Sequence, residues 1–60
     1  MNINDLKDSD VGRLAIYTAH HGERQEGTIS SWNDTYVFVR YGLGSTAVAT
    51  DPDQLEFSNP

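Results

Sequence analysis

Apolar and polar side chains alternate most regularly between residues 27 and 41. Two segments, 27–32 and 35–41, carry β-branched and aromatic residues with a period of two, the pattern of strands with two different faces. Asn33 and Asp34 separate them, and both residue types hydrogen-bond readily to their own backbone. The pattern therefore predicts a β-hairpin with a tight reversal at these two residues.

With Val37 and Val39 turned inward, the outer face of this hairpin carries three aromatic residues and one cation: Trp32, Tyr36, Phe38 and Arg40. Aromatic side chains and arginine are enriched where proteins contact each other, so these four residues are a candidate partner-binding site. Alternatively, the strand bends and the same residues cover a second small core against the N-terminal turn. Period-two alternation does not separate these two readings.

Three more short strands are predicted, at residues 11–17, 46–50 and 55–57. Alternation does not decide which face of the first strand is buried, because Leu14 and Ile16 form one apolar face and Ala15 and Tyr17 the other. Asp51 as an N-cap, followed by Pro52, predicts a helical turn just before the last strand. The chain divides into an N-terminal turn or loose arm (1–10), one domain (11–57) and a tail (58–60).

Five short strands in 60 residues favour an all-β fold. We expect a small, strongly bent five-stranded barrel, because closure removes exposed sheet edges. The expected core consists of Leu14, Ile16, Ile29, Val37, Val39, Tyr41, Ala47, Ala49 and Leu55. A core of this size stabilises a domain only marginally against chain entropy, so we expect a monomer or a weak dimer.

The formal net charge is −5, from nine acidic and four basic residues, and the chain has no cysteine. This charge disfavours nucleic acid as a partner, because binding to a phosphate backbone depends on clustered lysine and arginine. Without cysteine the chain has no disulfide or thiolate metal site, and no apolar run approaches the ~20 residues of a membrane span. We expect a cytoplasmic protein with no membrane attachment.

No set of residues points to catalysis or to a cofactor, since the serines stand in no nucleophile motif and no glycine-rich phosphate loop is present. Residue types that ligate metals gather in one segment, at His20, His21, Glu23 and Glu26. Adjacent histidines in an extended segment point to opposite sides, however, and the spacing typical of metal sites is missing. We interpret this segment as an exposed loop and predict no enzyme, no cofactor and no metal.

Several short patterns occur in a characteristic order: Val11-Gly12, Ala15-x-Tyr17, Gly27-x-Ile29, Val37-Phe38-Val39-x-Tyr41-Gly42 and Pro52-x-x-Leu55. Over residues 11–57 this order resembles the Src-homology-3-like small barrels, Tudor domains in particular. The resemblance implies an aromatic cage for a methylated lysine or arginine, for which the chain offers Tyr17, Trp32, Tyr36 and Tyr41. At ~3.3 Å per residue, Tyr36 and Tyr41 lie about 16 Å apart, so the four cannot form one cage.

The chain is also similar to small acidic proteins encoded in the early regions of tailed bacteriophages and prophages. The matching residues are Gly12-Arg13, Tyr17, Gly27-Thr28-Ile29-Ser30-Ser31 and the segment 33–41. This resemblance implies a phage or prophage origin but no mechanism, because most proteins of this kind have no assigned activity.

Three hypotheses follow. The first is a non-enzymatic barrel that binds a host protein through the outer face of the hairpin, with acidic loops steering the encounter. The second is a nucleic-acid-associated barrel of the transcription or translation type, in which a basic and aromatic strip overcomes the net charge and binds single strands in a salt-dependent way. That strip consists of Arg13, Arg40, Tyr36 and Trp32. The third is an accessory subunit held by pairing at a sheet edge.

Overall fold

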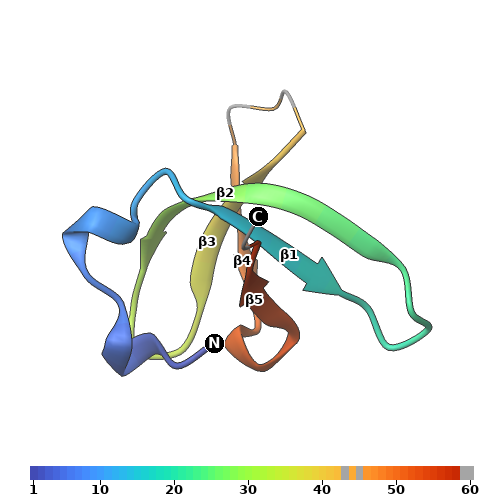
Figure 1. The fold of residues 1–60 in the computed structure, drawn as a ribbon, viewed down its shortest axis with the longest axis horizontal. Coiled ribbons are helices and arrows are strands. Elements are labelled where there is room, and N and C mark those ends of the chain that lie inside the picture. The colour runs from blue at the N-terminus through green and yellow to red at the C-terminus, as the bar shows by residue number, and fades with distance from the viewer. Residues whose placement is uncertain (43, 45, 59–60) are drawn as a thin grey trace.

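A computed structural model describes residues 1–42, 44 and 46–58 (Figure 1). Within these residues the chain forms five strands and three single-turn 3₁₀ helices. In chain order they are η1 (Ile3–Asp5), η2 (Asp8–Asp10), β1 (Leu14–Thr18), β2 (Arg24–Trp32), β3 (Val37–Tyr41), β4 (Ala47–Thr50), η3 (Pro52–Gln54) and β5 (Leu55–Phe57). The five predicted strands and the helical turn before the last one form, but β1 begins at Leu14 rather than at residue 11, and β2 begins at Arg24, within the segment that we interpreted as an exposed loop. Of the predicted tail only Ser58 is described, and residues 59 and 60 lie outside the described part.

All paired strands are antiparallel and belong to one sheet, in the order β4-β3-β2-β1-β5. Consecutive strands pair from β1 to β4, and the chain then passes through η3 to place β5 beside β1. The sheet is strongly curved, and the long strand β2 bends across it (Figure 1). β4 and β5 are its two edges and do not pair with each other within the described residues. The fold is therefore all-β with an open sheet, where we expected a closed barrel.

The reversal between β2 and β3 is held by the side chain of Asn33. Its Oδ1 accepts hydrogen bonds from the backbone N–H of Thr35 at 2.8 Å and of Tyr36 at 2.7 Å. The backbone N–H of Asn33 in turn donates to the carbonyl of Tyr36 at 2.9 Å. The predicted reversal is confirmed, and it works through the side chain of asparagine bonding the local backbone.

A β-bulge interrupts the pairing of β2 with β3. Ile29 lies opposite Val39, but the next pair is Ser31 with Phe38, so Ser30 is an extra residue in β2. An extra residue resets the alternation of side chains along the bulged strand. Trp32 consequently lies opposite Val37 and shares the inner face with Ile29.

The core lies on the inner, concave face of the sheet. Five side chains are almost completely buried there: Ala15, Ile29, Val37, Val39 and Leu55. Partly buried side chains pack around them, namely Met1, Ile3, Leu6, Tyr17, Trp32, Tyr41 and Phe57. Four of the expected core residues are absent from this cluster: Leu14, Ile16, Ala47 and Ala49. The expected core residues of the hairpin and Leu55 are therefore confirmed, those of β1 and β4 are wrong, and Trp32 is an additional core contact that was not expected.

The inward face of β1 is decided by the space at Gly27. Ala15 lies opposite Gly27 and is fully buried, whereas Leu14 is 48% exposed. A Cβ atom on Gly27 would lie 2.6 Å from both the carbonyl oxygen of Arg40 and Cγ1 of Val39. The sheet folds so tightly beside Gly27 that the inner face accepts only the methyl group of Ala15, so Leu14 and Ile16 point outward, while Tyr17, two residues farther along, is again on the inner face.

The N-terminal segment is folded onto the sheet. The side chain of Asn2 caps η1 by accepting from the backbone N–H of Asn4 at 3.0 Å. The amino group of Met1 donates to the carbonyls of Pro52 at 2.8 Å and of Leu55 at 3.0 Å. Residues 1–10 are thus two capped turns, and the loose arm considered from the sequence is not what forms. No helix in the described part of the chain is long and apolar enough to cross a membrane.

Candidate functional site: the outer sheet face and the inner cleft

The four residues predicted to bind a partner do not form one surface. Phe38 and Arg40 lie on the outer face of β3, two residues apart. Tyr36 is 44% exposed within the reversal. Trp32 packs against the core, and its predicted place on the outer face is wrong because of the bulge at Ser30.

Directly opposed residues of an antiparallel sheet share one face, so the register defines the surface around Phe38. Phe38 lies between Ser31 on β2 and Ala49 on β4, and Arg40 lies between Thr28 and Ala47. Leu14 lies opposite Thr28 and so extends the row of Thr28, Arg40 and Ala47 across β1. We name this surface the outer-face patch; its residues are Leu14, Thr28, Phe38, Arg40, Ala47 and Ala49.

Small neighbours leave the apolar part of the outer-face patch open to solvent. Phe38 is partly exposed and does not belong to the core cluster. Ser31 and Ala49 beside it are both exposed and too short to cover an aromatic ring. Sequence reasoning missed Leu14, Ala47 and Ala49 here because it assigned them to the core, and only the crowding at Gly27 reveals the correct face of β1.

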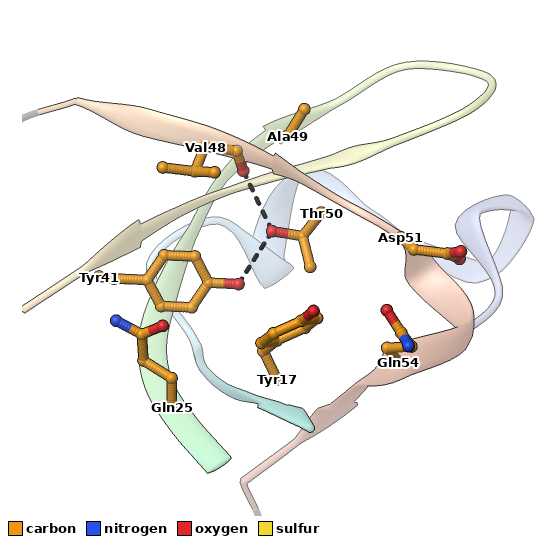
Figure 2. Close-up of a pocket in the computed structure, with 8 residues that line it drawn as sticks. All are labelled: Tyr17, Gln25, Tyr41, Val48, Ala49, Thr50, Asp51 and Gln54. Carbon is orange, nitrogen blue, oxygen red and sulfur yellow. Dashed lines mark hydrogen bonds between the residues drawn. The ribbon is translucent and has the colours of Figure 1, made fainter. Parts of the chain in front are cut away.

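A second feature is an inner cleft of about 370 Å³ between β4 and the ends of β1 and β3 (Figure 2). One wall is the segment 48–51. The other side carries the side chains of Tyr17, Gln25, Tyr41 and Gln54. The rings of Tyr17 and Tyr41 meet edge to face, with centroids 6.4 Å apart and planes at 66°.

A short hydrogen-bond chain fixes the position of Tyr41 in the inner cleft (Figure 2). Thr50 Oγ1 donates its single hydrogen to the carbonyl of Val48 at 3.2 Å. The hydroxyl of Tyr41, 2.9 Å from Thr50 Oγ1, must then be the donor between these two groups. Burial raises the pKa of Tyr41, the hydrogen bond with Thr50 opposes that rise, and the neighbouring Tyr17 adds to it.

The structure brings together two of the four aromatic residues considered for a cage. Tyr17 and Tyr41 are in contact, whereas Trp32 borders a separate shallow depression that also includes Val11 and Ser31. Tyr36 lies in the reversal at the other end of β3. The four do not converge on one point.

The histidine segment is exposed. His21 Nε2 lies 3.2 Å from Glu23 Oε2, with 69% and 81% of these side chains exposed. His20 contacts Gln54 instead, at 3.3 Å between Nε2 of the two side chains. No cluster of three metal-ligating side chains occurs in the part of the chain that the structure describes.

The strip considered for nucleic acid is also divided. The guanidinium of Arg13 donates to Asp10 Oδ1 at 2.9 Å and lies 3.8 Å above the ring centre of Phe57. Asp10 is buried and also accepts the backbone N–H of Lys7 at 2.9 Å. The hydrogen bond from the backbone N–H of Lys7 lowers the pKa of Asp10 most, and the hydrogen bond from Arg13 lowers it further. Arg13 therefore supports the structure of the N-terminal segment, while Arg40 lies on the outer face.

Comparison with known proteins gives no match: no family model, curated protein or solved structure is significantly similar to this chain. Function must therefore be argued from the two surfaces described above.

Proposed function

We propose that this chain is a small non-enzymatic binding module that attaches to a protein partner through the outer-face patch. The observation that carries the proposal is the partly exposed ring of Phe38 among short side chains, on the same face as the half-exposed Leu14. Aromatic and aliphatic anchors of this kind supply most of the binding energy in protein interfaces, at about 1.5–3 kcal/mol for a large side chain fully removed from water.

The strand order supports a more specific fold within this proposal. A meander of four strands, a 3₁₀ turn and a short last strand beside the first is the arrangement expected of a Src-homology-3-like module. Modules of this superfold host many functions, so the fold supports a binding role without naming the ligand. A host protein as the partner is part of this proposal; it rests on the net charge and on the exposed apolar residues of the outer-face patch.

Carboxylates border the outer-face patch on the side of β1. Ile16 lies opposite Glu26 in β2 and opposite Glu56 in β5; both glutamates are exposed, and Glu56 forms an ion pair with Arg24 at 3.3 Å. With a net charge of −5, these groups favour a partner with a basic rim and increase the rate of its association.

The test is a pulldown from bacterial lysate, followed by titration of the purified partner against variants. The tag belongs at the C-terminus because the amino group of Met1 is hydrogen-bonded to Pro52 and Leu55. We expect Phe38→Ser and Leu14→Ser to weaken binding at least about tenfold each, as for interface anchors.

Val11→Ser is the matched control, because Val11 is 51% exposed, close to the value for Leu14, and does not belong to the patch. It should bind as the wild type does. Equal affinity of the wild type, Phe38→Ser and Leu14→Ser would contradict the proposal, provided that all of them keep the circular dichroism spectrum of the folded protein.

A further inference from the structure

We propose that the edge of β4 accepts an extended, basic segment of a partner protein as a sixth strand. This second interaction surface adjoins the outer-face patch and shares Ala47 and Ala49 with it, but it uses their backbone groups where the patch uses their side chains, and it is tested with different variants. Within the described residues β4 pairs with β3 alone, so its other side carries no strand. An unpaired strand edge is a template for another extended chain.

The register shows which backbone groups lie along this edge. The N–H and C=O of Ile29 are bonded to Arg13 at 3.0 Å and Gly12 at 2.7 Å, on the β1 side. Ile29 and its opposite residue Val39 are therefore a pair that exchanges no hydrogen bonds, and Val39 turns its groups toward β4. Val48, opposite Val39, is bonded to β3 in consequence.

Backbone groups alternate in direction along a strand, so the residues on either side of Val48 point the other way. The N–H and C=O groups of Ala47 and Ala49 are directed to the open edge. Their side chains are single methyl groups, which present no steric barrier to an incoming strand. β4 is short, with four residues, but it contains no proline, lysine or bulge, which are other features by which natural edge strands prevent pairing.

The inner cleft beside this edge determines the chemistry of the partner. In a strand paired with β4, residues opposite Val48 and Thr50 share their inner face and point toward the cleft. The carboxylate of Asp51 lies in its wall, oriented by the backbone N–H of Asp53 at 2.9 Å. Lysine, arginine and histidine are absent from the residues that line the cleft. A lysine or arginine side chain therefore fits this position, and an acidic one does not.

Val48 adds an apolar contribution to the same contact. Its side chain is 50% exposed on the inner face, although Val39 opposite is fully buried. The aliphatic part of a lysine or arginine side chain would cover Val48 on its way to Asp51.

The experiment uses three end-blocked nine-residue peptides and the 60-residue protein. The first alternates lysine and valine, the second replaces each lysine by glutamate, and the third keeps lysine but carries N-methyl groups on the valine backbone. We expect the first to bind and to slow hydrogen exchange at the amides of Ala47 and Ala49. The N-methylated peptide keeps the charge but loses the strand-forming donors, so we expect it to bind at least about tenfold more weakly. The glutamate peptide should not bind.

Ala49→Pro is the decisive variant, because it removes an edge donor and leaves the pairs between β3 and β4 intact. This variant should lower the affinity for the lysine–valine peptide at least about tenfold while the protein stays folded. Asp51→Asn keeps the cap of η3 but loses the charge, and should reduce both the affinity and its salt dependence. Leu14→Ser is the control for the outer-face patch and should bind the peptide as the wild type does.

Four results would overturn the proposal. The first is equal binding of the lysine–valine peptide and its N-methylated form, and the second is equal binding of the lysine and glutamate peptides. The third is hydrogen exchange at the amides of Ala47 and Ala49 of the wild-type protein that does not slow when the lysine–valine peptide is added. This measurement needs no variant, so it still tests the proposal if Ala49→Pro fails to fold. The fourth is a dissociation constant of the lysine–valine peptide weaker than about 1 mM.

Discussion

Trp32 lies opposite Val37 in the β2–β3 pair, on the face of the sheet that carries the core. Phe38, the next residue of β3, lies on the other face. Trp32→Ala should therefore lower the free energy of unfolding by about 2–3 kcal/mol, less than for a fully buried tryptophan, and Phe38→Ala by less than about 1 kcal/mol. Urea titrations followed by circular dichroism measure both values. A larger loss for Phe38→Ala than for Trp32→Ala would contradict the inward position of Trp32.

Gly27 should tolerate no side chain. A Cβ atom there would lie 2.6 Å from the backbone oxygen of Arg40, which cannot move without shifting β3. We expect Gly27→Ala to cost at least about 2 kcal/mol of stability, because overpacking displaces the backbone. Gly44→Ala is the matched control, since its nearest contact is an ordinary 3.5 Å to the carbonyl of Tyr41. Similar midpoints of urea unfolding for the two variants would contradict the tight fold at Gly27.

Removing the hydroxyl of Tyr41 tests the hydrogen-bond chain of the inner cleft. Tyr41→Phe loses the bond to Thr50 Oγ1, while Thr50 keeps its bond to Val48. The expected cost is about 1 kcal/mol, the usual net value of a neutral hydrogen bond. Thr50→Val removes both bonds and should cost more. The measurement is the change in unfolding free energy at neutral pH, and no loss in Tyr41→Phe would show that the bond contributes nothing.

Alkaline pH should destabilise the protein partly through the same tyrosine. The pKa of Tyr41 is raised above the ordinary value of 10.0, so the folded state retains the phenolic proton longer than the unfolded chain does. The stability is therefore unaffected at pH values well below 10.0, and it falls as the pH rises through the pKa that Tyr41 has in the folded state. The decrease between about pH 9 and about pH 11 should be smaller in Tyr41→Phe than in the wild type. An equal decrease in both proteins would assign it to other groups.

Asp10 should make the stability depend on pH at the acidic end of the range. Its pKa is lowered below 3.8 by the backbone N–H of Lys7 and by Arg13, so its contribution is present above that value and is lost as the pH falls through the folded pKa. Asp10→Asn should lower the melting temperature at pH 7, and the difference from the wild type should disappear in strong acid. Arg13→Gln, which keeps Asp10, should show a smaller change at pH 7. A difference that persists unchanged in acid would contradict the role of the carboxylate.

The hairpin and the last helical turn could be read from the sequence because their signals are local. Asn33 bonds the backbone within three residues, and Asp51 with Pro52 begins a turn by the same kind of short-range chemistry. The inward face of β1 could not be read in this way. It depends on the crowding of Gly27 by Val39 and Arg40, which belong to another strand.

The candidate site was predicted in part for the same reason. Phe38 and Arg40 follow simple alternation and lie on the outer face. Trp32 does not follow this alternation, because the extra residue Ser30 shifts it by one position. No residue type near Ser30 indicates a bulge in the sequence. The edge of β4 and the inner cleft depend on how five strands are ordered, which residue patterns do not specify when the strands are this short.

The pairing of β5 with β1 has a consequence for the way the chain folds. The pairs from β1 to β4 join strands adjacent in sequence, whereas Ala15 meets Phe57 almost at the other end of the chain. Closing so long a loop costs more entropy than closing a hairpin, so the meander is expected to form first and β5 to dock last. Leu55 enters the core with this final strand and is only 2% exposed. The core is therefore completed only when a strand of three residues docks after the meander has formed, and mutations in β5 should accelerate unfolding more than they slow folding.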